Sequence, residues 1–126
     1  MHGAKLVLTL KSKPMRLILK ELYIYTQEEC NVASYIVVDV EITDPAEYQN
    51  YTKQTAATLE PYGGKFIVRG GNAEALEGDW QPKRFVVIEF PGVEQAKAWY
   101  NSPEYSSIIG IRHRSANSRM ILVQGV

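Results

Sequence analysis

The chain has 126 residues, of which 45% are hydrophobic and 22% charged, and its formal net charge is zero; this is typical of one globular domain without a nucleic-acid or anionic-membrane partner. No stretch has the roughly 20 mainly apolar residues of a transmembrane helix. One cysteine, Cys30, and two histidines, His2 and His113, exclude an intrachain disulfide and a Cys/His zinc cluster. We therefore expect no metal and no cofactor, in a cytoplasmic protein.

The segment 1–33 differs from the rest of the chain in its charge. It carries five Lys/Arg against three acids, and no acid precedes Glu21. Three explanations are open: an artefact of the gene model with the true start at Val32, a cleaved or disordered leader, or an element added to the domain. A signal peptide fits poorly, because the apolar run KLVLTL is short and no small-residue cleavage site follows it. We favour the artefact and expect a single domain over 34–126.

That domain begins with a predicted strand and helix. Residues 34–42 (SYIVVDVEI) are rich in β-branched side chains, and their acids alternate with apolar residues. A helix is expected from Pro45, which suits the first helical position. Asp44 suits the N-cap, and Glu47 has the spacing of a capping box.

The stretch YGGKFIVRGG at 62–71 is interpreted as a strand, 65–69, between two glycine pairs. Gly63 suits a left-handed position that ends the preceding helix. Gly70 and Gly71 follow Arg69 and would allow a bulge or bend at the sheet edge, or leave room beside the guanidinium. The run RGG lacks the strand-to-helix setting of a phosphate-binding loop.

The remaining predicted strands and helices complete the order of a ferredoxin-like fold. A strand is predicted at 84–90, a helical segment at 93–111 with a break before Pro103, and a last strand at 118–124. The order β-α-β-β-α-β predicts a ferredoxin-like α+β fold, in which an antiparallel four-stranded sheet carries two helices on one face.

Both faces of the predicted sheet carry apolar residues. Ile36, Val38 and Val40 share the face that the helices would cover. The bare face would hold another apolar set: Val37, Ile67, Phe85, Val87, Ile121 and Val123. A patch of this kind is larger than a monomer usually exposes. We therefore expect a homodimer that pairs sheet against sheet with twofold symmetry.

Three charged residues, Asp39, Arg69 and Glu89, are expected on that same bare face. In the ferredoxin-like order the third strand lies between the first and the second, so Arg69 could lie near Glu89, with Asp39 one strand further on. If the face is covered, such charges must pair. One interpretation is an ion-pair network in the dimer core. The other is a cleft in which Arg69 binds a carboxylate or enolate and Asp39 or Glu89 moves a proton.

Other candidates are weaker. His113 lies between two arginines, which would favour its neutral form and suit a general base, although a solvated loop residue is the simpler interpretation. Tyr48, Trp99 and Tyr100 could bind a ligand between helices and sheet, although aromatic residues at helical spacing usually belong to the core.

Several motifs, in order along the chain, resemble the small bacterial family catalogued as domain of unknown function 1330. They are TDPAEY (43–48), YGGKFIVRGG (62–71), LEGDWQPKRFVVIEFP (76–91), AKAWYNSPEY (96–105) and ILVQGV (121–126). The family resembles the dimeric α+β barrel group, whose subunits pair sheet to sheet. The resemblance implies this fold and a homodimer, but no established reaction, and residues 1–33 have no counterpart in the family pattern.

Two functions therefore stay open. The first is a small cofactor-independent enzyme that acts on an apolar or aromatic organic acid or ketone by proton transfer or isomerisation, supported by analogy at the level of the fold; an oxygen-using variant would need no visible motif. The second is a ligand-binding or structural homodimer in which Asp39, Arg69 and Glu89 form a buried ion-pair network.

Overall fold

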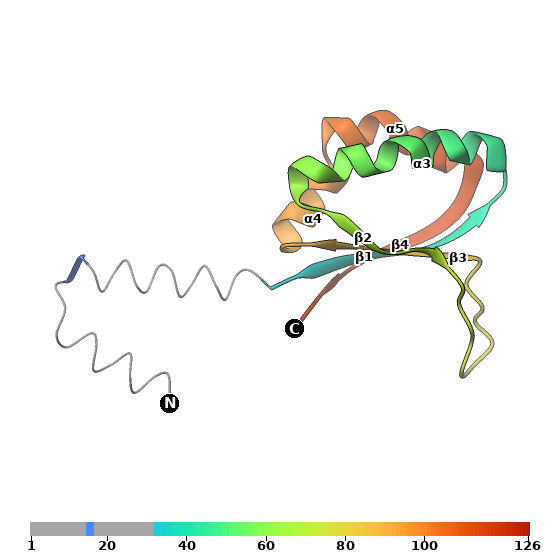
Figure 1. Cartoon of the computed structure of the whole chain (residues 1–126), viewed down its shortest axis with the longest axis horizontal. Coiled ribbons are helices and arrows are strands. Elements are labelled where there is room, and N and C mark those ends of the chain that lie inside the picture. Colours follow the sequence, from blue (N-terminus) through green and yellow to red (C-terminus); the bar gives the residue numbers. More distant parts are fainter. Residues whose placement is uncertain (1–14, 17–31) are drawn as a thin grey trace. The chain divides into compact units, whose positions relative to one another are not determined.

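The computed structural model describes residues 15–16 and 32–126 (Figure 1). Met15 and Arg16 are helical. The other expectations for the segment before Val32 fall outside the described residues. In the part of the chain that is described, no helix has the length and apolar character needed to cross a membrane.

Residues 32–126 form an α+β domain with the predicted ferredoxin-like order. Its elements are β1 (Ser34–Ile42), α3 (Pro45–Leu59), the 3-10 helix η1 (Glu60–Tyr62), β2 (Lys65–Gly71), β3 (Arg84–Phe90), α4 (Val93–Tyr100), α5 (Pro103–Ser115) and β4 (Ala116–Gln124). The strands lie in the order β2-β3-β1-β4, and neighbouring strands are antiparallel. Figure 1 shows α3 and α5 side by side over one face of the sheet, with α4 at one end of this layer.

The helix α3 begins at a capped turn, as the sequence predicts. The side chain of Asp44 accepts a hydrogen bond of 3.2 Å from the N–H of Glu47, and Pro45 occupies the first turn, where its missing N–H has no helical partner to lose. The N–H of Asp44 does not use the Glu47 side chain, because it donates to the carbonyl of Ser115 at 3.0 Å. Gly63, with φ of 72°, provides the predicted left-handed cap.

The predicted break before Pro103 divides the second helical segment into α4 and α5. The hydroxyl of Ser102 caps α5 by accepting a hydrogen bond of 3.1 Å from the N–H of Tyr105. Contrary to the expectation of a loop, His113 lies in the last turn of α5, which continues to Ser115. Positive charge is favourable there, because the helix dipole is negative at its C-terminus.

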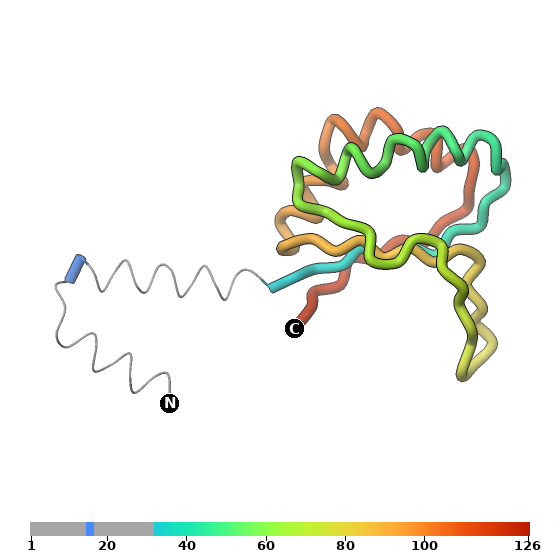
Figure 2. The backbone as a smooth tube through the Cα atoms, viewed as in Figure 1, coloured from blue at the N-terminus to red at the C-terminus, as the bar shows by residue number. Residues whose placement is uncertain are grey.

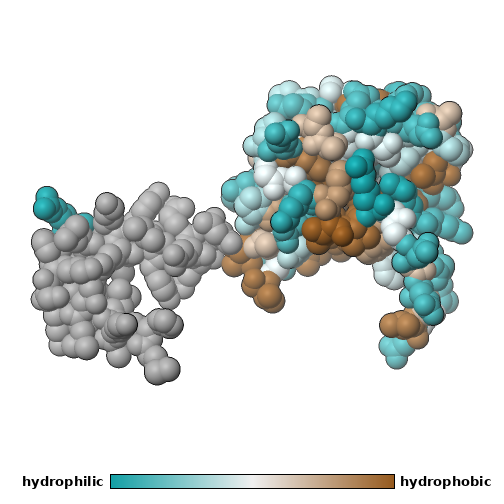
Figure 3. Space-filling model, in the orientation of Figure 1, coloured by the Kyte–Doolittle hydropathy of each residue, from teal (hydrophilic) through white to brown (hydrophobic). Residues whose placement is uncertain are grey.

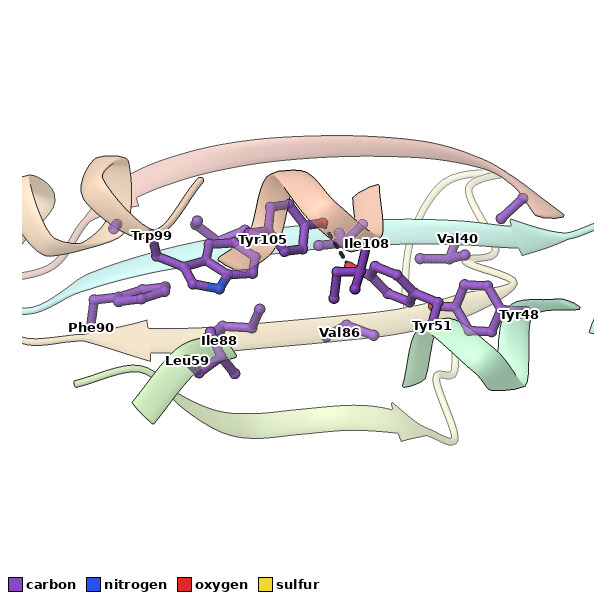
Figure 4. Packing of buried hydrophobic residues seen from close by; sticks show 14 residues of the cluster. Val40, Tyr48, Tyr51, Leu59, Val86, Ile88, Phe90, Trp99, Tyr105 and Ile108 are labelled. Atoms are coloured by element: carbon purple, nitrogen blue, oxygen red, sulfur yellow. Dashed lines mark hydrogen bonds between the residues drawn. The ribbon is translucent and has the colours of Figure 1, made fainter. Parts of the chain in front are cut away.

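A row of aromatic side chains fills the layer between helices and sheet (Figure 4). In spatial order the row is Phe90, Trp99, Tyr105, Tyr51 and Tyr48, with neighbouring ring centroids 4.0 to 6.2 Å apart. All five side chains are buried. Because the last three are tyrosines, the layer is apolar at one end and carries hydroxyl groups towards the other.

The face of the sheet opposite the helices, here called the open face, carries a second apolar set, as predicted. On β4, Ile121 and Val123 are 59% and 42% exposed and pair with Val37 and Tyr35 of β1. Figure 2 shows the connection between β2 and β3 standing out from the sheet on this side. In Figure 3 the helical layer is mostly teal, and brown apolar surface gathers at the level of the sheet beneath it.

The alternation of β2 is interrupted twice, and this overturns one prediction. Register shifts separate Phe66 from Val68 and Arg69 from Gly71. Arg69 therefore pairs with Val86, a buried residue of the helix-covered face, although simple alternation would place it on the open face. A bulge adds one residue to a strand and so changes the face on which the following side chains lie.

Candidate functional site

The predicted group of Asp39, Arg69 and Glu89 does not form. Glu89 is on the open face and pairs with Lys65 at 3.1 Å. Arg69 is on the helix-covered side, where its Nη2 donates to the carbonyl of Thr52 at 2.9 Å. Neither the expected ion-pair network nor the expected Asp/Arg/Glu cleft is therefore present. The bulge in β2 moves Arg69 to the other face, and the register of β1 with β3 sets Asp39 opposite Phe85, four residues along the strand from Glu89.

Asp39 holds the connection between β2 and β3. Its carboxylate accepts hydrogen bonds from the indole N–H of Trp80 (3.0 Å) and from the backbone N–H of Lys83 (3.2 Å). The guanidinium of Arg119 lies 3.4 Å away. The hydrogen bond from Trp80 is the main cause that lowers the pKa of Asp39. A carboxylate held in its ionised form by these donors is suited to anchoring a loop and poorly suited to accepting a proton.

The other sequence candidates are dispersed. His113 is exposed on α5, and Trp99 is fully buried in the aromatic row. Tyr100 is 41% exposed and lines a different groove, beside Leu122 of β4. Gly71 has open space around it. None of these four residues contributes to the cavity between α3, α5 and the sheet.

A pocket lies between α3, α5 and the sheet, at the tyrosine end of the aromatic row. It has an inner cavity of about 30 Å³ and an adjoining outer groove of about 340 Å³. Four residues line both parts: Tyr48, Thr52, Arg69 and Arg84. We call the two parts together the helix–sheet pocket.

Arg84, the first residue of β3, is the central cation of this pocket. Its guanidinium carbon lies 5.9 Å from the ring centroid of Tyr48, and its buried Nε has no hydrogen-bond partner among the described residues. The guanidinium packs directly against Gly70, whose φ is 73°. A Cβ at Gly70 would overlap Nη1 of Arg84 and lie 2.7 Å from Cζ. Gly70 thus leaves room for the guanidinium of Arg84, whereas the sequence suggested that the glycines make room for the guanidinium of Arg69.

Arg112 of α5 is the innermost cation of the pocket. It is only 5% exposed. Its Nε donates to the hydroxyl of Tyr105 at 3.2 Å, and a terminal nitrogen donates to the hydroxyl of Ser118. The Tyr105 hydroxyl lies 2.7 Å from that of Tyr51, as the dashed line in Figure 4 shows. Arg112 thus begins a chain of hydrogen bonds that leads to Tyr51, which lines the inner cavity.

The pocket is positively charged. Three arginines line it (Arg69, Arg84 and Arg112), and its lining contains no aspartate or glutamate. Among the described residues, no carboxylate oxygen lies within 4.0 Å of a guanidinium nitrogen of these three arginines, so none of them forms a salt bridge. Arg112 is buried and Arg84 half-buried; because guanidinium groups withdrawn from water without a counter-charge are unfavourable, the arrangement favours an anion from outside the chain.

The tyrosines of the pocket act as neutral hydrogen-bonding groups. Burial is the main cause that raises the pKa of Tyr51, and its neighbour Tyr105 raises it further. Burial also raises the pKa of Tyr48, although the charge of Arg84 opposes the shift. Both hydroxyls therefore stay protonated at physiological pH.

The lining does not suit a metal ion. Among residues 15–16 and 32–126, no group of three or more His, Cys, Asp or Glu side chains is placed to hold one. Guanidinium forks and phenol hydroxyls are instead suited to planar anionic oxygens such as those of carboxylates.

The sequence contained signals for two pocket residues that were missed. Arg84 shares the buried face of β3 with Val86 and so interrupts an apolar set. Arg112 follows Tyr105 and Ile108 at helical spacing on the buried face of α5. An arginine at a position that periodicity assigns to the core indicates a buried charge with a specific role.

Comparison with solved structures supports the fold. A protein of unknown function from Rhodopseudomonas palustris superposes with a TM-score of 0.63 at 19% identity, covering 85% of this chain and 93% of that one. SnoaB, a cofactor-independent oxygenase from Streptomyces nogalater, gives 0.54 at 15% identity, covering 75% and 94%. A dimeric ferredoxin-like protein of unknown function from Thermobifida fusca gives 0.52 at 12% identity, covering 75% and 92%. At these identities the likeness concerns the fold alone.

The sequence comparisons agree with the resemblance noted above. No curated protein matches the chain. The model of a protein family, the domain of unknown function DUF1330, matches residues 33–126, which include every strand of the sheet and all the pocket residues. The chain therefore belongs to the DUF1330 family.

Proposed function

We propose that this protein binds a small organic anion with an apolar or aromatic body in the helix–sheet pocket. The observation that carries the proposal is the set of arginines without acidic partners, and above all the buried, unpartnered Nε of Arg84. An arginine fork matches the two oxygens of a carboxylate. The rings of Tyr48 and Phe66 in the same lining would contact an apolar body.

The sizes of the two spaces support a small ligand. The outer groove, of about 340 Å³, offers room for a ring, which agrees with the lower range of ligand pockets at about 300 Å³. The inner cavity, of about 30 Å³, has room for one small polar group or for water. Arg84 lines both and would hold the carboxylate at their junction.

Thermal denaturation of the full chain with benzoate tests this proposal. A ligand at a hundred times its Kd stabilises a protein by about 2.7 kcal/mol, so a concentration-dependent rise in Tm is expected. The change Arg84→Gln should reduce it strongly. Lys53→Gln is the matched control, because Lys53 is an exposed cation of α3 outside the pocket. Equal responses of the two variants would contradict the proposal.

A cofactor-independent enzyme is the second candidate. The chain of hydrogen bonds from Arg112 to Tyr51 favours it, because these groups can donate to a bound oxygen on which negative charge develops. SnoaB is a protein of similar fold that is an oxygenase without a cofactor. Asp39, Glu89 and His113 do not line the pocket and so are not its general base. Exchange of the benzylic hydrogens of phenylpyruvate in D₂O, followed by NMR, tests proton transfer; a rate equal to that of buffer would contradict it.

We also propose a homodimer formed through the open face. Its support is the exposed pair Ile121 and Val123 and the dimeric protein of similar fold from Thermobifida fusca. Light scattering should give twice the chain mass for the wild type, and Ile121→Asp should give a monomer. Ala57→Asp places the same charge at an exposed position of α3 and should leave a dimer. A monomeric wild type would contradict the proposal.

A further inference from the structure

The hydrogen-bond chain of the pocket begins at a fixed donor. The Nε–H of Arg112 can only donate, so the hydroxyl oxygen of Tyr105 accepts. A hydroxyl that accepts from a cation becomes a stronger donor. The contact of 2.7 Å between the two tyrosine oxygens admits either hydroxyl as its donor, and the direction in which Tyr105 donates to Tyr51 continues the chain from Arg112. The proton of the Tyr51 hydroxyl then has no acceptor among the bonds that this chain forms.

That proton lies at the inner cavity. Tyr51 and Arg112 both line this space, together with apolar side chains of the sheet such as Val38 and Val86. Its volume of about 30 Å³ admits one oxygen-bearing group but no ring. A ligand that occupies the outer groove can therefore reach the inner cavity with a single oxygen atom.

We propose that the inner cavity is an oxyanion site, in which Tyr51, supported by Tyr105 and Arg112, donates a hydrogen bond to a ligand oxygen that ionises on binding. This inference rests on the proposed function, since the ligand's carboxylate lies at Arg84. The ligand class is then an aromatic or apolar acid that also carries an ionisable hydroxyl, as a phenol or an enol does. Its O–H bond breaks, the electron pair stays on the oxygen, and the proton goes to bulk water.

The charged and hydroxyl-bearing groups around the cavity favour a negatively charged oxygen and oppose the cost of burying it among apolar side chains. The helices contribute Tyr48 and Tyr51 from α3 and Arg112 from α5, and the strands contribute Arg69 from β2 and Arg84 from β3. The lining from β1 and β4 is uncharged. Burial raises the pKa of Tyr51, so its hydroxyl stays a donor when a phenolate lies beside it.

The probe that tests this inference is 2-hydroxy-5-nitrobenzoate, whose hydroxyl lies beside the carboxylate on the ring and whose phenolate absorbs visible light. The absorbance of the full chain saturated with the probe, followed against pH, gives the pKa of the bound phenol. We expect it to lie at least about one unit below that of the free probe, which corresponds to about tenfold tighter binding of the phenolate. Tyr51→Phe should remove most of this shift, and Tyr105→Phe, which interrupts the chain from Arg112, should remove part of it.

Two controls separate a direct role from a structural one. Tyr62→Phe removes a tyrosine hydroxyl that bonds Glu104 outside the pocket and should leave the pKa of the bound phenol unchanged. The companion ligand 3-nitrobenzoate lacks the hydroxyl, so Tyr51→Phe should change its affinity less than about twofold, whereas Arg84→Gln should weaken both ligands.

The outcomes distinguish this inference from the proposed function. If the probe binds through Arg84 but its phenol titrates as in water, the oxyanion site is wrong and the anion pocket stands. If the phenol pKa is lowered equally in the wild type and in Tyr51→Phe, the arginine charges act alone and the assignment to Tyr51 is overturned. If neither nitro compound binds, both proposals fail for aromatic acids.

Discussion

Replacing Gly70 by alanine acts on the guanidinium of Arg84 as well as on the backbone of β2. Gly70 has φ of 73°, and its Cα faces the guanidinium so closely that a methyl group would overlap Nη1. An L-residue in left-handed geometry costs roughly 1–2 kcal/mol. Arg84 must also leave the ring of Tyr48, and such a cation–π contact contributes about 0.5–1 kcal/mol.

One effect opposes these losses. Alanine restricts the unfolded chain, which returns about 0.4–1 kcal/mol. The net loss for Gly70→Ala is then about 0.5–2.5 kcal/mol, and in a domain of this size each kcal/mol lowers Tm by about 4–8 °C. Because the guanidinium is displaced from the pocket, the affinity for benzoate should fall together with the stability.

The assay is thermal denaturation of the full chain with and without benzoate, with Gly71→Ala as the matched control. A methyl group at Gly71 would meet no atom within 4 Å, and the φ of Gly71 is not positive, so this change should leave both Tm and the benzoate response nearly unaltered. Equal Tm values and equal benzoate responses for the two variants would refute the packing of Arg84 on Gly70.

Three further predictions concern stability and charge. Thr58→Val should lower the free energy of unfolding by about 1–3 kcal/mol in urea titrations, because the buried indole N–H of Trp99 loses its acceptor at 3.0 Å, and Thr58→Ser should restore most of it. The hydrogen bond from Trp80 lowers the pKa of Asp39 in the folded state, so the ionised carboxylate stabilises the fold above its ordinary pKa of about 3.9, and this contribution is lost as the pH falls through the lowered pKa. The fluorescence of Trp80 should change over the same pH range. An identical acid profile of the Asp39→Asn variant would contradict this prediction. Arg69→Ala, which removes an exposed contact to a backbone carbonyl and the packing of the guanidinium over the ring of Phe66 at 4.1 Å, should lower stability by about 0.5–1 kcal/mol and reduce the benzoate response by a measurable but smaller factor than Arg84→Gln.

The fold could be predicted from the sequence because each boundary carries local chemistry. Asp44 and Pro45 begin α3, Gly63 ends the turn after it, and Ser102 with Pro103 separates α4 from α5. Such signals act over a few residues, so one sequence is enough to recognise them. The two apolar faces of the sheet followed in the same way from strict alternation along β1 and β3.

The site could not be predicted in the same way, because alternation fails in β2. The first of the two bulges, between Phe66 and Val68, places Arg69 on the helix-covered side, and no residue type there marks the insertion, whereas the second bulge follows Arg69 at the glycine pair that the sequence did mark. The prediction of an Asp39–Arg69–Glu89 group depended on an unbroken strand and on a register that the sequence does not give, since Asp39 lies opposite Phe85 and Glu89 opposite Tyr35. Arg84 and Arg112 were within reach, since each occupies a position that periodicity assigns to the core.

The central claim, that Arg84 binds a carboxylate in the helix–sheet pocket, is tested most directly by NMR of the arginine side chains. In ¹H–¹⁵N spectra of the full chain, the Nε–H signal of Arg84, assigned by its loss in Arg84→Lys, should move and saturate as benzoate is added, because this buried donor gains an acceptor. The signal of Arg119, which lies on the open face beside Asp39, should stay in place. A stationary Arg84 signal at benzoate concentrations that shift Arg119 would contradict the account.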